Sequence, residues 1–208
     1  MVKTKNLSFS YDNLANFSFP DIKIDEGEHL LILGVSGVGK TTLLYLMSGL
    51  LKPLNGNVFI DAIDINSLSR QKLNEFRGEK LGFIFQQYHF IKSLSLLENL
   101  QLRQNYPKTS DDKERRLDLM RRLGLDQFSH RKVVNLSQGQ QQRLAIALGI
   151  VHKPKIVFAD EPTSNLDDYN CLKVIELLKE EARISKSSLI IITHDFRIKS
   201  HFKNHIVL

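Results

Sequence analysis

Residues 29–42 read HLLILGVSGVGKTT, and this stretch decides the fold class. Its first part, HLLILG (29–34), is a short apolar run of the kind that forms a buried parallel strand. The second part, GVSGVGKTT (34–42), has the G-x-x-x-x-G-K-T spacing of a phosphate-binding loop and leads into a predicted helix over about 39–49. A strand, a glycine-rich loop and a helix in this order predict a phosphate site at one end of a parallel sheet.

The residue types in the loop indicate what it binds. Glycines let the backbone wind tightly with its amides pointing inward, and the N-terminus of the following helix adds positive potential. Lys40 brings a full positive charge toward the β- and γ-phosphates of a nucleotide, and Thr41 brings a hydroxyl ligand for Mg²⁺. We therefore predict that the whole loop binds nucleotide: Gly34, Val35, Ser36, Gly37, Val38, Gly39, Lys40, Thr41 and Thr42.

Three further apolar runs predict buried strands at 81–85 (LGFIF), 155–160 (KIVFAD) and 188–193 (SLIIIT). Patterns typical of helices separate them, over 95–104, 111–124, 137–152 and 168–185. This alternation predicts an α/β fold with a parallel sheet. The stretch from about Gln87 to Val134 has helical patterns without strong strands, which predicts a helical lobe between two halves of the sheet. We find no repeat or linker, so residues 1–208 are expected to form one domain.

The composition limits the class of protein and its location but does not identify its function. A chain of 208 residues, 42% hydrophobic, can bury a core without disulfides or metals, and the single Cys171 is expected to pack inside a helix. The net charge of +6 favours anionic partners, but basic and acidic residues alternate, so a solvated surface explains it as well and nucleic acid is not expected. No apolar run approaches the roughly 20 residues that span a bilayer, and the first residues lack the apolar stretch of a secretion signal. We therefore expect a cytosolic protein.

An acidic pair follows the strand KIVFAD. Asp160 and Glu161 stand at its carboxyl end, beside the place where the glycine loop would hold phosphate. Asp160 suits the Mg²⁺ shell, and Glu161 suits a general base that polarises the attacking water. A strand that ends in Asp-Glu-Pro is also common in exposed turns, and it is the glycine loop upstream that favours catalysis.

A second helix start has the features of an anion site. In NLSQGQQQRLAIAL, Ser137 suits an N-cap and Gly139 leaves the backbone open to a ligand. Since the chain already has a complete phosphate loop, a second such helix start suggests that two chains share each nucleotide. Here the sequence resembles the ABC ATPase family, whose LSGGQ signature appears as LSQGQ at 136–140.

The resemblance covers essentially the whole chain, with the motifs in family order. Gln86 in FIFQQ is similar to the Q-loop glutamine, SNLD (164–167) to the D-loop with Asp167, and His194 in ITHD to the switch histidine. Tyr11 in FSYD is similar to the aromatic residue that stacks on adenine. Taken singly, Tyr11 is an ordinary strand aromatic and His194 a surface histidine, and only their order and spacing favour the functional reading.

The resemblance implies a P-loop NTPase fold of the ABC ATPase type. It adds an antiparallel β part near the N-terminus and a helical signature lobe at about 87–150, inserted in a RecA-like core. It also implies an ATPase with ATP and Mg²⁺ as cofactors. The implied metal-site residues are Thr41, Gln86 and Asp160, and the implied catalytic residues are Lys40, Gln86, Glu161 and His194.

The family architecture further implies a homodimer whose subunits meet head to tail, with two ATP between the phosphate loop of one and the signature of the other. Ser137, Gln138, Gly139 and Gln140 would face the nucleotide from the second chain. This sequence departs from the family at Gln138, in place of a glycine, and at Leu148, in place of the usual arginine. The bulk of Gln138 is expected to change dimer affinity or turnover. Because the sequence ends soon after His194, we expect regulation to come from partners.

Three stretches, GLLKPLNGNV, LNEFRGEKLGFIFQ and DEPTSNLD, resemble the branch of lipoprotein-release, macrolide-efflux and cell-division ATPases. This resemblance implies a peripheral protein on the cytoplasmic face of the inner (cell) membrane that drives an integral membrane permease. The region from Gln86 to Asn99, chiefly Tyr88 to Asn99, would form the groove for the permease's coupling helix, unless these residues only pack the lobe.

Other members of the superfamily offer alternatives. An ATPase of a soluble assembly or cell-division complex would use the same dimer cycle without transport. A DNA-repair ATPase fits less well because there is no long coiled-coil insertion or zinc motif. Translation factors of the superfamily normally carry two such domains, and here there is one.

Overall fold

The computed structural model describes residues 2–11, 15–106, 112–164 and 166–208. Its centre is a parallel sheet with the strand order β10-β4-β9-β8-β7. These strands are β10 (Asn204–Val207), β4 (His29–Leu33), β9 (Ser188–Thr193), β8 (Ile156–Asp160) and β7 (Leu81–Ile84). The four predicted strands are therefore confirmed, and β10 adds an edge that the sequence patterns did not indicate.

Both faces of this sheet are buried, which is why its strands are continuous apolar runs. In β4, Leu31 and Leu33 point into one hydrophobic cluster and Leu30 and Ile32 into the other. The same alternation holds along β8 and β9. The sheet therefore separates two cores.

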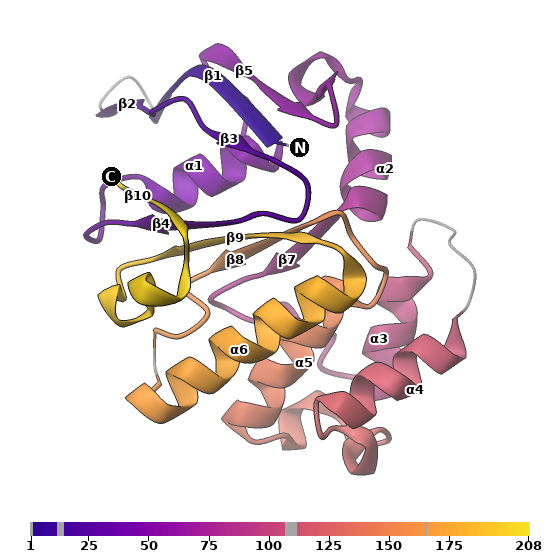
Figure 1. The fold of residues 1–208 in the computed structure, drawn as a ribbon. Helices are drawn as coiled ribbons and strands as arrows, with labels where there is room; N and C mark the ends of the chain where they lie inside the picture. Colours follow the sequence, from indigo (N-terminus) through magenta and orange to yellow (C-terminus); the bar gives the residue numbers. More distant parts are fainter. Residues whose placement is uncertain (1, 12–14, 107–111, 165) are drawn as a thin grey trace.

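A second, antiparallel sheet covers one of these cores. It consists of β1 (Val2–Tyr11), β2 (Ala15–Ser18), β3 (Lys23–Ile24), β5 (Asn55–Ile60) and β6 (Ile63–Asp64). Helix α1 (Lys40–Met47) lies between the two sheets, and its leucines pack against both (Figure 1). This arrangement confirms the antiparallel part that the family resemblance implied and places the glycine loop at the end of β4.

Helices cover the opposite face of the parallel sheet (Figure 1). Helices α5 (Gln138–Ile150) and α6 (Asp168–Ser185) pack on its strands. Helix α3 (Leu96–Gln104) packs on α5 and α4 (Lys113–Arg122) on α3, while α2 (Arg70–Lys80) runs beside β7. Four short 3₁₀ turns complete the described elements: Ile65–Ser67, Asp126–Phe128, Val133–Asn135 and Phe196–His201. Residue 111, the predicted start of the helix over 111–124, lies outside the described residues. None of the helices in the described ranges is long and apolar enough to cross a membrane.

The helical segment separates the two halves of the sheet only along the chain. It leaves from β7 and returns to β8, yet these strands are neighbours in register, with Leu81 opposite Ile156. The lobe is attached through α5, which packs on β7 backbone to backbone: a Cβ atom added to Gly82 would lie 2.0 Å from the carbonyl oxygen of Gly149. Glycine at 82 is therefore required for α5 to approach the sheet this closely.

Candidate ATP site

The glycine loop holds its own lysine in place. Gly39, the N-cap of α1, has φ of 101°, and a Cβ atom there would lie 2.7 Å from the ring of Phe17. The ammonium of Lys40 is almost fully buried and donates to the carbonyl oxygens of Gly34 at 2.7 Å and Val35 at 3.1 Å. The loop thus presents a fixed positive charge at its centre, as an anion site requires.

Asp160 and Thr41 form an oxygen-rich corner beside the loop. The hydroxyl of Thr41 donates to Oδ2 of Asp160 at 3.3 Å, whereas the buried Oδ1 has no hydrogen-bond partner within the described part of the chain. Burial raises the pKa of Asp160 to about 6, and the neighbouring charge of Glu161 adds to this effect. A buried carboxylate oxygen without a donor, next to a threonine hydroxyl, fits the oxygen ligands that Mg²⁺ prefers.

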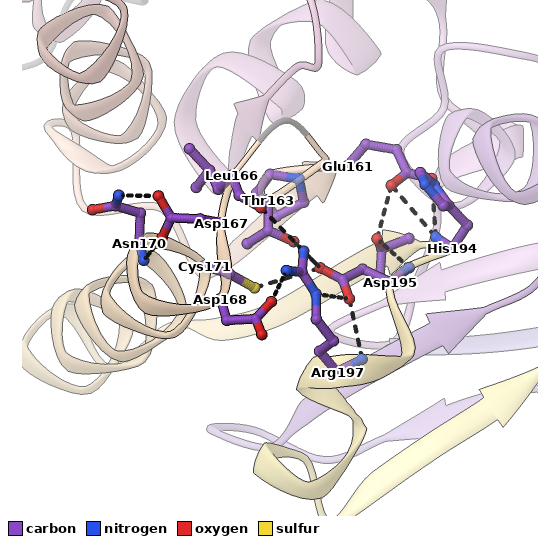
Figure 2. A network of polar contacts seen from close by, with 12 residues as sticks. Glu161, Thr163, Leu166, Asp167, Asp168, Asn170, Cys171, His194, Asp195 and Arg197 are labelled. Atoms are coloured by element: carbon purple, nitrogen blue, oxygen red, sulfur yellow. Dashed lines mark hydrogen bonds and ion pairs between the residues drawn. The ribbon is translucent and has the colours of Figure 1, made fainter.

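Glu161 is oriented from three directions. Its Oε2 accepts a hydrogen bond from the hydroxyl of Thr193 at 2.7 Å, and Oε1 lies 2.9 Å from Nδ1 of His194 and 3.8 Å from Nζ of Lys40. Figure 2 shows Glu161 and His194 facing each other. Glu161 also has φ of 49°, a left-handed conformation that costs a non-glycine residue about 1–3 kcal/mol and persists where surrounding contacts fix it. The structure therefore brings Lys40, Glu161 and His194 together.

A cavity of about 320 Å³ joins these groups. Its lining includes loop residues and the three residues predicted from other segments: Phe17, Ser36, Gly37, Gly39, Lys40, Thr41, Thr42, Gln86, Glu161 and His194. The volume is within the range of small-molecule sites. Gln86, two residues after the end of β7, thus lines the same cavity as the loop.

Aromatic rings lie on the β1 side of the loop. The hydroxyl of Tyr11 is 3.3 Å from Oγ1 of Thr42, and its ring, 46% exposed, stands edge-on to Phe9 and Phe17. This position suits stacking on a flat base. Sequence reasoning missed Phe17, which lines the cavity and packs on Gly39, and no motif marked it.

The signature residues do not line this cavity. Gln138 and Gly139 line a second cavity of about 560 Å³, to which Gln86 and Glu161 also contribute. Ser137 and Gln140 form a capping box at the start of α5: Ser137 Oγ accepts from the amide of Gln140 at 3.3 Å, and Gln140 Oε1 accepts from the amide of Ser137 at 2.8 Å. Within one chain, the signature and the phosphate loop therefore belong to separate cavities.

Gly139 has no steric need for glycine in the described structure. A Cβ atom added there would meet nothing within 4 Å. Glycine near a helix start is costly relative to alanine, so its presence favours a group outside these residues that approaches the backbone closely.

Asp167, the acidic residue of the predicted D-loop, lies at the start of α6. It caps α6, accepting hydrogen bonds from the amide of Asn170 at 2.9 Å and from its side chain at 2.7 Å, and these bonds lower its pKa. It lines neither cavity. Of the SNLD stretch, residue 165 lies outside the described residues.

A lysine-bearing glycine loop after β4, a carboxylate pair at the end of β8 in the same sheet and an exposed glycine at a helix start, all on this α/β core, define a P-loop ATPase. The sequence profile of the family described as ABC transporter matches residues 18–164, and the chain belongs to this family. The predicted family, fold and ATPase class are thereby confirmed.

Relatives and solved structures agree with this assignment. The lipoprotein-releasing system ATP-binding protein LolD of Legionella pneumophila (strain Paris) is 35% identical over 190 residues, which cover 90% of this chain and 84% of LolD. The ABC transporter ATP-binding protein MJ0796 of Methanocaldococcus jannaschii is 36% identical over 208 residues, covering 95% and 88%. A dimeric structure of MJ0796 superposes with a TM-score of 0.89 at 34% identity, covering 100% of this chain and 94% of that one. Another dimeric structure of this cassette, with the same scores, is a post-hydrolysis state bound to ADP and Pi.

Proposed function

We propose that this chain hydrolyses ATP at composite sites between two copies of itself, with Glu161 as the general base, and uses the cycle to drive a membrane permease. The observation that carries the proposal is the Glu161 carboxylate, held by Thr193 and His194 at 3.8 Å from the ammonium of Lys40. A carboxylate fixed at the edge of a phosphate loop is in place to orient and polarise a water molecule.

The remaining residues of the site would bind and neutralise the nucleotide. Lys40 and the loop amides would hold the β- and γ-phosphates, and Tyr11 would stack on adenine. Thr41, Asp160 and Gln86 would hold Mg²⁺, which supplies charge neutralisation on the phosphate oxygens. Electrostatic stabilisation of this kind is the main contribution to phosphoryl transfer.

The second chain would complete each site. Two observations support this: Gly139 is open to an external group, and the MJ0796 cassette forms dimers. Ser137, Gln138, Gly139 and Gln140 would then face the γ-phosphate bound by the partner, and Gln138 would alter the affinity because it is bulkier than the family's glycine. Asp167 would act from its capped position at the same interface.

A third cavity, separate from the two described above, has the character of a docking groove for a helix of a membrane permease. Its volume is about 190 Å³, and its lining is largely aromatic: Phe83, Phe85, Tyr88, His89, Phe90, Arg103, Ala145 and Leu148. It contains part of the predicted 86–99 region, and Leu148 makes its wall more apolar than the arginine usual in the family. We propose that a helix of an integral membrane permease occupies it, so that the chain is peripheral on the cytoplasmic face of the membrane. The relatives named LolD favour a permease of the lipoprotein-release type, and the resemblance of the sequence to the wider branch keeps a macrolide-export permease as the alternative.

The first test is the molar mass of Glu161→Gln by light scattering, with and without ATP and Mg²⁺. Loss of the general base is expected to slow hydrolysis about 10²- to 10⁴-fold and to leave binding intact, so an ATP-dependent dimer should accumulate. Glu180→Gln is the matched control, because Glu180 is an exposed carboxylate paired with Arg183. Wild-type turnover in Glu161→Gln would remove Glu161 as the base. A strictly monomeric chain would contradict the shared site.

The permease is tested by co-purification from detergent. Recovery of a polytopic membrane protein supports transport, whereas a soluble partner alone would favour an assembly ATPase. Leu148→Glu places a charge in the groove and should release the membrane partner while ATP hydrolysis persists. Ile184→Glu, at an exposed position near the end of α6, should release nothing.

A further inference from the structure

The carboxylate of Asp195, directly after the switch histidine, gathers donors from three parts of the chain (Figure 2). It is 8% exposed, and its Oδ2 accepts from the hydroxyl of Thr163 at 3.2 Å and from the thiol of Cys171 at 3.4 Å. Burial raises the pKa of Cys171, so the thiol stays protonated and can donate. Cys171 is buried, as predicted for a packing residue, and it also has a polar partner.

Arg197 completes this cluster and extends it. Its Nε donates to Oδ1 of Asp195 at 2.8 Å and its Nη2 to Oδ2 at 2.7 Å, a two-pronged pairing that only arginine can make. On its other side the same guanidinium contacts the carboxylate of Asp168 and, at 3.3 Å, the carbonyl oxygen of Leu166. Arg197 therefore links the segment after β9 to the start of α6.

The cluster also leads to the site. The amide of Asp195 donates to the hydroxyl of Thr193 at 3.0 Å, and this hydroxyl donates to Oε2 of Glu161 at 2.7 Å. Thr193 and Thr163 are fully buried, so water cannot replace these bonds. Arg197 is thus linked to the Glu161 carboxylate through two residues: it holds the side chain of Asp195, whose backbone amide binds the Thr193 hydroxyl that contacts Glu161. Asp195 and Arg197 themselves line neither cavity.

We infer that Asp195 and Arg197 are positioning residues for ATP hydrolysis, which set the geometry of Glu161 and His194 and tie it to the start of α6. The inference rests on the proposed function of Glu161. Asp167 precedes Asp168 at that helix start, so the linked segment is one that the proposed dimer would bring against the second chain. Contact of the second chain with the start of α6 would then affect the position of Glu161 through the guanidinium of Arg197.

Arg197→Lys tests the inference because it keeps the charge and removes the two-pronged pairing. Misplacement of Glu161 should lower kcat about 10- to 100-fold. Binding of ATP should change by less than about threefold, because no contact to the nucleotide is lost. Arg183→Lys is the matched control, because Arg183 also pairs with a carboxylate, that of Glu180, through Nε and Nη2, but on the exposed surface of α6. The kcat of this control variant should equal that of the wild type.

Two further comparisons separate positioning from a general loss of structure. In the Glu161→Gln background, Arg197→Lys should have no additional effect on the residual rate, because both changes act on one group. Thr163→Val removes the hydroxyl that donates to Asp195 and should lower kcat. Thr163→Ser keeps this hydroxyl and should have the kcat of the wild type. This pair decides the matter if Arg197→Lys does not fold.

The outcomes are distinguishable. Unchanged kcat in both Arg197→Lys and Thr163→Val would overturn the inference, and so would an undiminished effect of Arg197→Lys in the Glu161→Gln background. If Glu161→Gln itself keeps the wild-type rate, the proposed base is wrong, and this is a failure of the proposed function.

Discussion

Replacing Asp195 with asparagine should destabilise the protein in a way that depends on pH. The guanidinium of Arg197 holds the pKa of Asp195 down at about 2, against 3.8 in an unfolded chain. This gap corresponds to about 2 kcal/mol of stability, since each pKa unit is worth about 1.4 kcal/mol. Because the folded-state pKa is the lower one, the contribution is complete above about pH 5 and is lost as the pH falls through about 4 to 2. At pH 3 about half of it should remain.

Urea unfolding of the wild type and Asp195→Asn at pH 7, 5, 4 and 3, without nucleotide, measures how much less stable the variant is at each pH. Other carboxylates titrate equally in both proteins, so the difference in the free energy of unfolding isolates position 195. Glu180→Gln, which removes an exposed carboxylate from the pair with Arg183, should cost little at any pH. A difference between wild type and Asp195→Asn that is constant from pH 7 to 3 would refute the reasoning, because the loss would then not come from charge.

Four further substitutions test the loop, the cores and the signature. Lys40→Ala should weaken ATP binding at least about 10- to 100-fold, the usual worth of a charged hydrogen bond, and calorimetry showing unchanged affinity would contradict the phosphate loop. Phe158→Ala, at a fully buried ring, should cost about 3–5 kcal/mol in urea unfolding. Gly82→Ala should destabilise by at least about 1–3 kcal/mol, because its Cβ atom would meet the backbone of Gly149. Gly139→Ala should leave the stability of the chain unchanged or raised, yet reduce ATP-dependent dimerisation in light scattering, whereas full dimerisation would show that nothing approaches this helix start.

The parts of the fold that sequence predicted are those whose residues carry a pattern by themselves. The strands of the parallel sheet are buried on both faces, so each is an uninterrupted apolar run. Helix α2 has only two large apolar residues, Leu73 and Phe76, both partly buried against the core, which is too short a pattern to predict it. In β1, VKTKNLSFSY, polar residues interrupt the apolar ones, and only the family resemblance indicated an antiparallel sheet there.

The same limit applies to the site. Lys40, Asp160, Glu161 and His194 belong to short motifs with a fixed spacing, so they could be identified in the sequence. Asp195 contacts residues 24 and 32 positions away in the chain, and no spacing rule joins such distant side chains. The sequence indicated these candidate groups, and only the fold shows which side chains hold them in place.

The separation of signature and phosphate loop into two cavities has a kinetic consequence. On the proposed shared site, each chain carries two halves of different sites and completes neither alone, so activity per molecule should rise with protein concentration and disappear on dilution. Two inactive variants, one damaged in the loop and the other in the signature, should regain activity when mixed, because a mixed pair contains one site built from two undamaged halves. In the cell, the local density of chains brought together by a common partner would then govern the rate of ATP consumption.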